Sequence, residues 1–599
     1  MRKKIAMLLV GLMTLTSVTA CSTKQDAPAD TKEQTTENNK QADIVIIGAG
    51  GAGMSAAIQA RQNGATNVVV VEKMAQTGGN TVRATGGLNA SETKFQAEKG
   101  IEDSNELFIE DTMKGGKNLN DKELVTTLVE NSNAAVEWVN EIGGDLGVVA
   151  MFGGASVERI HRPSDTSAVG PMLVKTFNKQ IETLEIPVLL ETTAKQIVVD
   201  EAGKITGVKI SNAEGESTID CTAVIIATGG FGANLDMVVE YDPSLKGFVG
   251  TNHAGATGDG IALGTEIGAA TVDLDQIQIH PTVDPETQTL YTEGVRGNGA
   301  ILVNLEGKRF VNELLTRDVV SAAILEQKDE TSYLVFDQAV RESLSAIEKY
   351  VSAGLTVEAD TIEELAEKIN VDAATLKETM TNYASYQAAG EDKEFGREDM
   401  AASLTTPKYY AAKCAPGIHH TMGGLKINTN AEVVNTDGNV ISGLFAAGEV
   451  TGGVHGANRL GGNAVADIVV FGRIAGTNAA KFVVDNGGNT TPTIVVEKTE
   501  EVEVTPEVQG NFVDGTYKGT SKGNNGDINV EVTVEGGNLV KVDVLEQHET
   551  EGLYDSALAK VVPAMIQKQT TEVDAVTGAT NSSNGLMGAV ADALKDATK

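Results

Sequence analysis

Histidine and arginine side chains recur in a few short segments that are rich in glycine or threonine. A planar guanidinium binds a carboxylate through two parallel hydrogen bonds, so arginine orients small carboxylates as well as attracting them. By its spacing alone, Arg317 between Thr316 and Asp318 is expected to clamp a carboxylate. The segments are His280-Pro281-Thr282, Thr292-Glu293-Gly294-Val295-Arg296-Gly297, Thr316-Arg317-Asp318, His419-His420-Thr421-Met422-Gly423-Gly424 and Asn458-Arg459-Leu460-Gly461-Gly462.

The composition of the chain excludes several classes of protein. With 47 basic and 83 acidic side chains, the 599 residues carry a formal charge of 47 − 83 = −36. Such a chain is a poor ligand for nucleic acid, which is a polyanion. The negative net charge does not exclude a small anionic ligand, because charges beyond about 8 Å are screened at physiological salt. The nearby arginines of these segments then decide whether the anion binds. Since 3 Cys cannot supply the thiolates of an iron–sulfur cluster or a Cys₄ zinc site, we expect no metal site. Cys221 and Cys414 are expected to be two unlinked, buried thiols.

A glycine pattern near the N-terminus predicts a dinucleotide site. Gly48-x-Gly50-x-x-Gly53 follows the apolar run 43–47 and opens a stretch with helical spacing. The glycines let the backbone approach a pyrophosphate, whose charge then lies at a helix N-terminus. Glu72 ends the next apolar run about twenty residues further on, where an acid binds ribose hydroxyls.

The residues after Glu72 favour FAD over NAD. Two further glycine-rich segments, 78–81 and 86–90, follow the acid closely. A glycine-dense loop at this place suggests a backbone that lies against a large flat ring system. An isoalloxazine ring is such a system, so redox chemistry would rest on an organic cofactor.

The apolar pattern predicts an α/β fold. The runs 43–47 and 68–71 with the helical stretch between them form a βαβ unit of a doubly wound parallel sheet, to which 222–230 and 443–448 return. A helical run is expected from Asp360 through Leu376. Residues 486–510 are expected to be a linker. Beyond it, alternating valines predict a hairpin at 528–544, with helices near 555–569 and 584–597, as a separate small α+β domain at 511–599.

From about residue 41 to 485 the chain resembles the flavocytochrome c type soluble fumarate reductases. The motifs above carry the resemblance, together with Gly153-Gly154-Ala155-Ser156 and His161-Arg162-Pro163. It implies an FAD-binding domain in two parts, 41–275 and 420–485, around an inserted α+β capping domain at 276–419, with the substrate between them. It implies non-covalent FAD contacts from Gly48, Gly50, Gly53, Glu72, Asn80, Thr81, Gly86, Gly87, Ala194, Asp259, His420, Glu449, Ala464 and Val465.

The resemblance also assigns substrate-binding residues. His419 and Arg459 are expected to hold one carboxylate, His280 and Thr292 to hold the other, and Gly462 to lie at the substrate. The implied reaction is hydride transfer from FAD to fumarate, which gives succinate.

The proton for this reaction is implied to come from an arginine. Arg317 matches the proton donor of the family, and Glu293 and Arg296 match its relay to solvent. Arginine is an unusual acid, so it serves only if the carbanion is very basic and the relay reprotonates the guanidinium at once.

Other substrates and another function remain open at this point. Relatives reduce urocanate, methacrylate or arylacrylates such as cinnamate, and they are expected to differ where the second carboxylate is held. Because His280 and Thr292 are both present, a dicarboxylate such as fumarate is favoured. The alternative from another class is an electron-transfer flavoprotein without substrate turnover. Succinate oxidation is disfavoured, because iron–sulfur and quinone partners are missing.

The C-terminal domain resembles covalent FMN-binding domains. The segment Asp574-Ala575-Val576-Thr577-Gly578-Ala579-Thr580 matches their acceptor sequence, in which the FMN phosphate is esterified to the last threonine, here Thr580. Asp514-Gly515-Thr516-Tyr517-Lys518-Gly519 matches the start of such domains. The resemblance implies a flavin transferase for maturation, and electrons that pass from a membrane donor to FMN, then to FAD, then to the substrate.

The N-terminus carries a secretory signal. Arg2, Lys3 and Lys4 precede an apolar run that ends in small residues before Cys21. Residues 1–20 are therefore a predicted signal peptide that resembles those of bacterial lipoproteins, with Cys21 as the lipidated residue and 21–40 as a flexible tether. We expect a protein on the extracytoplasmic face of the cell membrane, held by its lipid anchor only.

Overall fold

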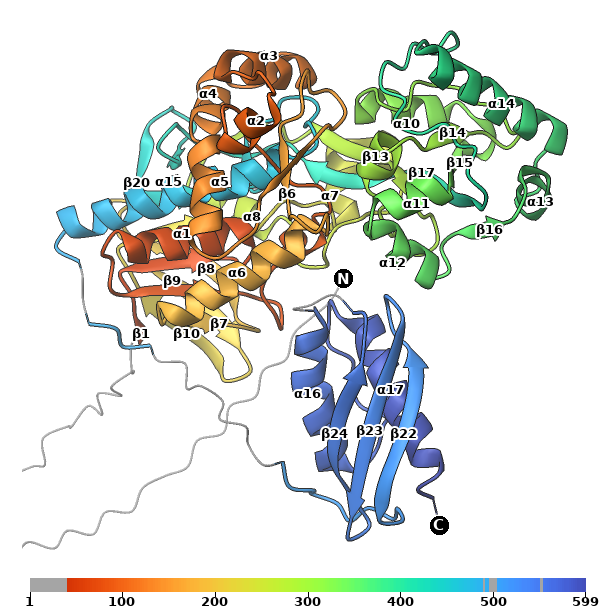
Figure 1. The fold of residues 1–599 in the computed structure, drawn as a ribbon. Coiled ribbons are helices and arrows are strands. Elements are labelled where there is room, and N and C mark those ends of the chain that lie inside the picture. The colour runs from red at the N-terminus through yellow and green to blue at the C-terminus, as the bar shows by residue number, and fades with distance from the viewer. Residues whose placement is uncertain (1–39, 489–490, 495–503, 550–552, 599) are drawn as a thin grey trace, which may run out of the picture. The chain divides into compact units, whose positions relative to one another are not determined.

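The structure is a computed structural model that describes residues 40–488, 491–494, 504–549 and 553–598 (Figure 1). The predicted signal peptide, Cys21 and nearly all of the predicted tether lie outside the described residues, as does the middle of the predicted linker. The described chain builds separate hydrophobic cores. One is formed by residues between Ala42 and Ile494 without the inserted segment, another by Tyr291–Cys414, and a third by residues after Ile528.

A parallel sheet forms the centre of the first core. Its strand order is β19-β20-β11-β2-β3-β7, and all neighbours are parallel except β19, which runs antiparallel to β20. Continuous apolar runs form its central strands because both faces are covered, and every residue of β2, β3 and β11 is buried. The bounds are β2 Ile44–Ile47, β3 Val68–Val71, β7 Val188–Leu189, β11 Ala223–Ile226, β19 Glu432–Val434 and β20 Val440–Ala446.

Two helices that are far apart in sequence pack side by side against this sheet (Figure 1). Helix α1 (Gly51–Gln62) follows β2, and α15 (Asn463–Asp485) returns from the end of the domain. Glycines in α15 allow the close approach: a Cβ at Gly472 would lie 2.7 Å from the Ala52 carbonyl oxygen, and one at Gly476 would lie 2.2 Å from that of Ala56. This packing fixes the start of both helices at the carboxyl edge of the sheet.

Smaller elements complete this domain. The four-stranded sheet β1-β10-β9-β8 comprises Lys40–Gln41, Gly215–Asp220, Ile205–Asn212 and Thr193–Val199. The other strands are β4 Leu88–Asn89, β5 Val148–Ala150, β6 Ile160–Arg162, β12 Thr271–Val272, β18 Gly424–Lys426 and β21 Thr451–Gly452. The helices are η1 Gly79–Arg83, α2 Lys94–Lys99, α3 Asn105–Gly115, α4 Lys122–Glu130, α5 Ser132–Glu141, α6 Val169–Thr183, α7 Leu235–Tyr241, η2 Pro243–Leu245 and α8 Asp259–Glu266.

The inserted segment forms an antiparallel sheet with helices around it. The long strand β17 (Tyr409–Thr421) pairs with β13 (Ile277–Val283), β15 (Ser332–Asp337) and β16 (Val357–Ala359), and β14 (Ile301–Val303) pairs with β15. Because β13 and β17 are paired, Gln278 lies opposite His420 and His280 lies opposite Gly417. The helices are α9 Glu293–Gly297, α10 Arg317–Leu325, η3 Lys328–Glu330, α11 Gln338–Ser343, α12 Ala346–Ser352, α13 Ile362–Lys368 and α14 Ala373–Ala389.

The C-terminal segment is a three-stranded antiparallel sheet with two helices. Strands β23 (Asp527–Glu535) and β24 (Asn538–Glu546) form the hairpin expected from the alternating valines. Helices α16 (Leu553–Lys568) and α17 (Thr580–Lys595) follow it. The sequence analysis missed β22 (Gly515–Lys522), which pairs with β23, because its polar residues show no apolar alternation.

Three expectations can be compared directly with these elements. The fold class is confirmed, as a parallel FAD-domain sheet with an inserted antiparallel sheet and a small α+β domain. The single helical run expected over 360–376 is wrong: Asn370 has φ +58°, and Asp372 then caps a second helix. Cys221 and Cys414 are buried free thiols, as expected. In the described part of the chain, no helix is long and apolar enough to cross a membrane.

The close contact between α1 and α15 yields the first prediction. Gly→Ala in a helix normally stabilises by about 1 kcal/mol, but the Cβ of Gly476→Ala would meet the Ala56 carbonyl oxygen at 2.2 Å. Because overpacking costs about 1–3 kcal/mol, we expect this variant to lower the free energy of unfolding, measured by urea titration. Lys481→Ala, at an exposed position of the same helix, is the control. Unchanged stability of Gly476→Ala would show that the helices separate without cost.

Candidate active site

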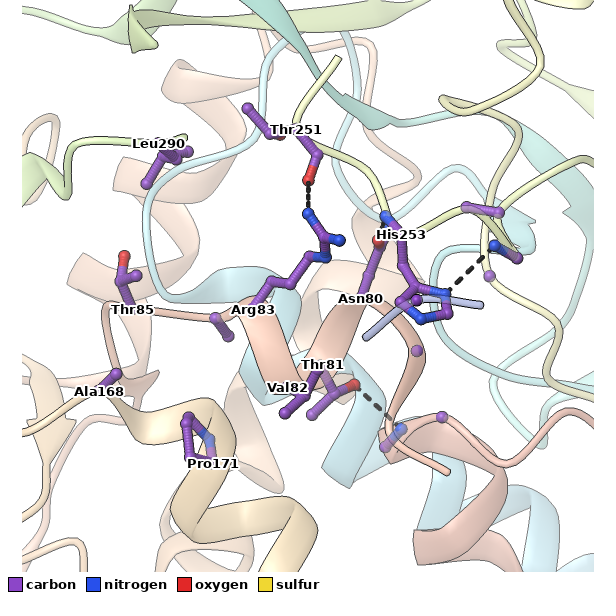
Figure 2. Close-up of a pocket in the computed structure, with 18 of the residues that line it drawn as sticks. Asn80, Thr81, Val82, Arg83, Thr85, Ala168, Pro171, Thr251, His253 and Leu290 are labelled. Carbon is purple, nitrogen blue, oxygen red and sulfur yellow. Dashed lines mark hydrogen bonds between the residues drawn. The ribbon is translucent and has the colours of Figure 1, made fainter. Parts of the chain in front are cut away.

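One large cavity collects most of the residues that the sequence analysis singled out. Its volume is about 1150 Å³, and residues of the FAD-binding and capping segments line it (Figure 2). Two predicted residues, Gly53 and Arg296, do not line it. The predicted residues that do are Gly48, Gly50, Glu72, Asn80, Thr81, Gly86, Gly87, Ala194, Asp259, His280, Thr292, Glu293, Arg317, His419, His420, Glu449, Arg459, Gly462, Ala464, Val465 and Thr580.

The glycine turn before α1 is shaped to admit a dinucleotide. Gly48 has φ +106°, and a Cβ there would lie 2.4 Å from the Ala227 carbonyl oxygen. Gly53 acts from outside the cavity: its missing Cβ, which would lie 1.9 Å from the Gly48 carbonyl oxygen, lets α1 start close to the strand end. No side chain caps α1 at Gly50. The Gly51 amide donates to Thr81 Oγ1 at 3.0 Å. With its other N–H groups, the first turn of α1 lies at the cavity wall, the arrangement that binds a pyrophosphate.

Glu72 is fixed at the end of β3 by backbone donors. The amides of Ala49 and Met74 donate to its two carboxylate oxygens, each at 2.8 Å. Burial raises the pKa of Glu72, against the lowering effect of these hydrogen bonds and of Lys73. Each oxygen keeps a lone pair for a hydroxyl donor. The residues at this end of the cavity therefore fit the ribose and pyrophosphate of FAD.

Other predicted FAD residues are connected to each other. Glu449 accepts hydrogen bonds from the Thr421 amide at 3.0 Å and from the Asn80 side chain at 3.1 Å, and burial raises its pKa. Asp259 is engaged differently: its carboxylate forms an ion pair of 2.7 Å with Lys73, on the cavity wall.

At the other end of the cavity, two guanidiniums meet at one neutral oxygen. Gln278 Oε1 accepts from Arg317 Nη1 at 3.0 Å and from Arg459 Nη2 at 3.1 Å. The Gln278 amide group donates to Asn458 Oδ1 at 2.7 Å and to the Arg459 carbonyl oxygen at 2.8 Å. Burial, followed by repulsion from Arg317, lowers the pKa of Arg459 to about 9. Like charges held this close favour an anionic ligand between them.

Glu293 is the carboxylate that accompanies this pair. Its Oε2 lies 2.9 Å from both Nε and Nη2 of Arg317, and 4.0 Å from Arg296 Nη2. Burial alone would raise the pKa of Glu293, but Arg317 and Arg296 lower it, so the carboxylate is ionised at neutral pH. Helix starts place these groups, because Glu293 is the first residue of α9 and Arg317 the first of α10.

Arg296 lies behind the cavity rather than at the surface. Its side chain is fully buried, and its Nη1 donates to the Glu313 carbonyl oxygen. The carbonyl oxygen of Arg296 accepts a hydrogen bond from Arg397 Nη2 at 2.6 Å. The expected relay therefore leads from Arg317 through Glu293 into the interior of the capping domain.

Neutral histidines complete the site. The rings of His280 and His419 lie 5.2 Å apart, and burial followed by repulsion from Arg317 holds the pKa of each well below its usual range. The Thr282 amide donates to Nδ1 of His280 at 3.3 Å, so the neutral ring carries its proton on Nε2. Within the described chain this Nε2 is buried and has no partner. Thr292 caps α9 through its hydroxyl oxygen.

Sequence reasoning missed Gln278, although a signal for it existed. Gln278 stands two residues before His280 on β13, and side chains two apart on a strand share a face. Arg83 and His253 also line the cavity and were not singled out.

Thr580 starts α17 with an exposed side chain. Gly578, with φ +88°, turns the chain before it. Ser583 fastens this turn: its Oγ accepts from the Val576 amide at 3.1 Å and donates to the Ala579 carbonyl oxygen at 2.9 Å. An accessible hydroxyl on a pinned turn of small residues fits a flavin phosphate ester.

Comparison with known proteins identifies flavin-binding domains in these parts of the chain. Residues 43–465 match the model of the FAD binding domain family, and residues 523–595 match that of the FMN-binding domain family. The protein is therefore a flavoprotein with an FAD-binding and an FMN-binding domain.

Individual relatives narrow this class. The chain is 47% identical over 441 residues to "Fumarate reductase (cytochrome)" of Shewanella frigidimarina, which covers 74% of this chain and 77% of the relative. It is 48% identical over 444 residues to "NADH:fumarate oxidoreductase" of Klebsiella pneumoniae, covering 74% of this chain but only 48% of that relative, about half its length. The solved open conformation of a flavocytochrome c3 fumarate reductase matches with TM-score 0.64 and 43% identity, over 74% of this chain and 79% of that one. The chain belongs to the flavocytochrome-type, FAD-dependent fumarate reductase family.

The bridge through Gln278 yields the second prediction. Gln278→Leu removes the oxygen that Arg317 and Arg459 share, and leaves both guanidiniums without that acceptor. Since losing a hydrogen bond to a charged group costs about 1.5–3 kcal/mol, we expect kcat/KM for the enzyme's substrate to fall at least tenfold, measured in steady-state assays. Gln278→Glu keeps an acceptor for both arginines, but its negative charge offsets the charge of Arg317 and Arg459. We expect this variant to lose activity mainly through a higher KM, because the arginines then attract an anionic substrate less strongly. Wild-type kinetics for Gln278→Leu would contradict this role.

Proposed function

We propose that the protein reduces fumarate to succinate. The observation that carries the proposal is the charge of the cluster at one end of the cavity. Three guanidiniums, those of Arg296, Arg317 and Arg459, stand against Glu293, the one carboxylate that forms ion pairs with any of them among the described residues. Burial raises the pKa of Glu449, a further carboxylate close to Arg459, so the cluster has an excess of positive charge. Fumarate is a dianion, and its two carboxylates neutralise this charge. A monocarboxylate would leave a buried positive charge without a partner.

The protein's own side chains would orient the substrate. His419 and Arg459 bind one carboxylate, and His280, with its free Nε2–H, binds the other together with Thr292. Reduced FAD supplies the hydride when it is bound. Burial of the site excludes water, which strengthens these charged hydrogen bonds.

Arg317 would deliver the proton. The hydride adds to one carbon of the double bond, and a proton from the guanidinium adds to the other. Glu293 Oε2, 2.9 Å from Nε and Nη2 of Arg317, is placed to return a proton to the guanidinium. Arg296 Nη2, 4.0 Å from that carboxylate, is the next group of the relay.

Reduction of another α,β-unsaturated carboxylate, such as urocanate, methacrylate or cinnamate, is the second candidate. A relative that is 38% identical over 457 residues is "Urocanate reductase" of Eggerthella lenta, which covers 73% of this chain and 74% of the relative. His280 and Thr292 at the cavity wall favour a dicarboxylate. The complete set of substrate-binding side chains also disfavours a pure electron-transfer flavoprotein.

The third prediction tests substrate and acid together. Fumarate should re-oxidise the anaerobically reduced protein rapidly, whereas urocanate, methacrylate and cinnamate should not, as measured by flavin absorbance. Arg317→Ala should lower fumarate turnover at least a thousandfold and still bind both flavins in reducible form. Arg341→Ala, which removes an ion-paired arginine from α11 outside the cavity, is the matched control. Re-oxidation by a monocarboxylate alone would overturn the dicarboxylate assignment, and turnover by Arg317→Ala would exclude Arg317 as the acid.

Electrons are proposed to arrive through FMN that is covalently attached to Thr580. Two observations support this proposal: residues 523–595 match the FMN-binding domain family, and the exposed hydroxyl of Thr580 lies on the wall of the cavity that the predicted FAD residues line. A flavin transferase would attach the FMN, and a membrane electron donor would reduce it. The signal pattern before Cys21 supports a lipid-anchored protein on the extracytoplasmic face. A covalent phosphoester would prevent loss of the flavin there.

The fourth prediction concerns the attachment site. The intact mass of protein matured with a flavin transferase should include one FMN after denaturation removes FAD. Thr580→Ala should lack that mass, because it removes the hydroxyl that forms the ester. Thr577→Ala, which changes the other threonine of the same turn, should keep it. An FMN mass on Thr580→Ala would refute the assignment.

A further inference from the structure

The cavity contains two donors, Arg83 and His253, that are not among the predicted FAD and substrate contacts. The N-terminus of α1 serves a pyrophosphate, and the arginine pair at Gln278 serves the substrate carboxylates. Arg83, the last residue of η1, and His253 lie on either side of Asn80 in the same cavity (Figure 2). Among the described residues neither forms a hydrogen bond with Gln278, Arg317 or Arg459. Arg83 contacts the Thr251 carbonyl oxygen, and the Thr251 hydroxyl lies 2.8 Å from His419 Nδ1.

The guanidinium of Arg83 has a weak partner and no carboxylate. Among the described residues, its only hydrogen bond is one of 3.5 Å from Nη1 to the Thr251 carbonyl oxygen. Among the ion pairs of the described residues, none involves Arg83, and burial alone lowers its pKa. The side chain nevertheless keeps accessible area, because that area faces the cavity. A cation in such a place favours an anionic ligand.

His253 adds an oriented donor. Its ring is buried, and burial, followed by the positive charges of Arg83 and Lys73, lowers its pKa to about 4. The Gly255 amide donates to Nδ1 at 3.2 Å, so the neutral ring carries its proton on Nε2. Within the described chain, Nε2 is buried and has no hydrogen-bond partner. The backbone fixes the residue, because its amide donates to Asn80 Oδ1 at 2.6 Å.

The acceptor turn of the FMN-binding domain meets this donor. A Cβ on Gly578 would lie 2.9 Å from His253 Nε2, and residues Thr577–Ser582 line the cavity that Arg83 faces. Lys349 and Lys522 line it as well. The carboxylates on its wall are those of Glu72, Asp165, the ion-paired Asp259, Glu293, Glu449 and Asp467. Position 578 requires glycine for two reasons: its φ of +88° is unfavourable for other residues, and a Cβ would come too close to His253 Nε2.

We infer that Arg83 and His253 form the receiving site for the phosphodiester that links FMN to Thr580. A phosphodiester carries one negative charge and two free oxygens, which match one guanidinium and one neutral N–H donor. The site would hold the FMN at the cavity that binds FAD. This inference rests on the proposed attachment of FMN to Thr580, and it adds residues of the FAD-binding domain to the binding of the second flavin.

The test measures binding of a free flavin, so it is independent of turnover. Thr580→Ala protein with FAD at full occupancy is titrated with free FMN and, separately, with riboflavin, and binding is followed by quenching of flavin fluorescence. FMN should bind at least tenfold more tightly than riboflavin, because only FMN carries a phosphate. Arg83→Leu and His253→Ala should reduce this preference at least fivefold, and Arg83→Lys should keep part of it. Lys308→Ala, which removes an exposed cation outside the cavity, is the control.

Each result decides one question. Equal binding of FMN and riboflavin by the Thr580→Ala protein would overturn the receiving site even if the mass measurement places FMN on Thr580. Equal loss of FMN and riboflavin binding in Arg83→Leu would mean that Arg83 only supports the fold, and would also overturn it. A second measurement uses the flavinylated full chain, in which Arg83→Leu should slow electron transfer from FMN to FAD at least tenfold. Transfer at the wild-type rate would contradict the inference.

Discussion

The arrangement of the active site depends on two buried guanidiniums that share one neutral acceptor. Gln278 Oε1 holds Arg317 and Arg459 within hydrogen-bonding distance of the same atom, at 3.0 and 3.1 Å. Their mutual repulsion is only partly offset by Glu293, so the site is electrostatically incomplete until an anion enters. This accounts for how a chain with a formal charge of −36 would bind the dianion proposed as its substrate. The decisive charges are buried and close, whereas the acidic surface is distant and screened.

The same excess of positive charge explains why His280 and His419 are neutral. Protonated rings at His280 and His419 would add charge to a cluster that already has an excess, and burial and Arg317 keep both neutral. A neutral ring with a fixed tautomer then contributes direction rather than charge. Arg83 and His253 combine the same two elements, one guanidinium and one neutral ring, at another part of the cavity. The proposed substrate and the proposed FMN phosphodiester would thus be bound by the same two kinds of side chain.

The sheet and its helices hold these groups at fixed positions. Strands β13 and β17 bring Gln278 opposite His420, and the first residues of α9 and α10 bring Glu293 to Arg317. On the FAD side, missing side chains matter more than present ones. Gly53 never faces the cavity, yet its lack of a Cβ allows α1 to start beside the turn at Gly48. The glycines of the motif indicate a cofactor site in the sequence, but at least Gly53 is needed for helix packing rather than for contact with the cofactor.

The sequence by itself determined the fold class and the residue types of the site, because these depend on local patterns. A strand, a glycine turn and a terminal acid predict the dinucleotide end, and arginine and histidine segments predict a carboxylate end. Tertiary structure decided which of these side chains meet. Gln278 was missed because its position two residues before His280 is only a weak signal. Its role appears once β13 places it between two arginines that are 142 residues apart in sequence, 459 − 317. Arg83 and His253 were missed for a similar reason. That Arg83 has no carboxylate partner and His253 Nε2 no hydrogen-bond partner among the described residues becomes visible only in the folded chain.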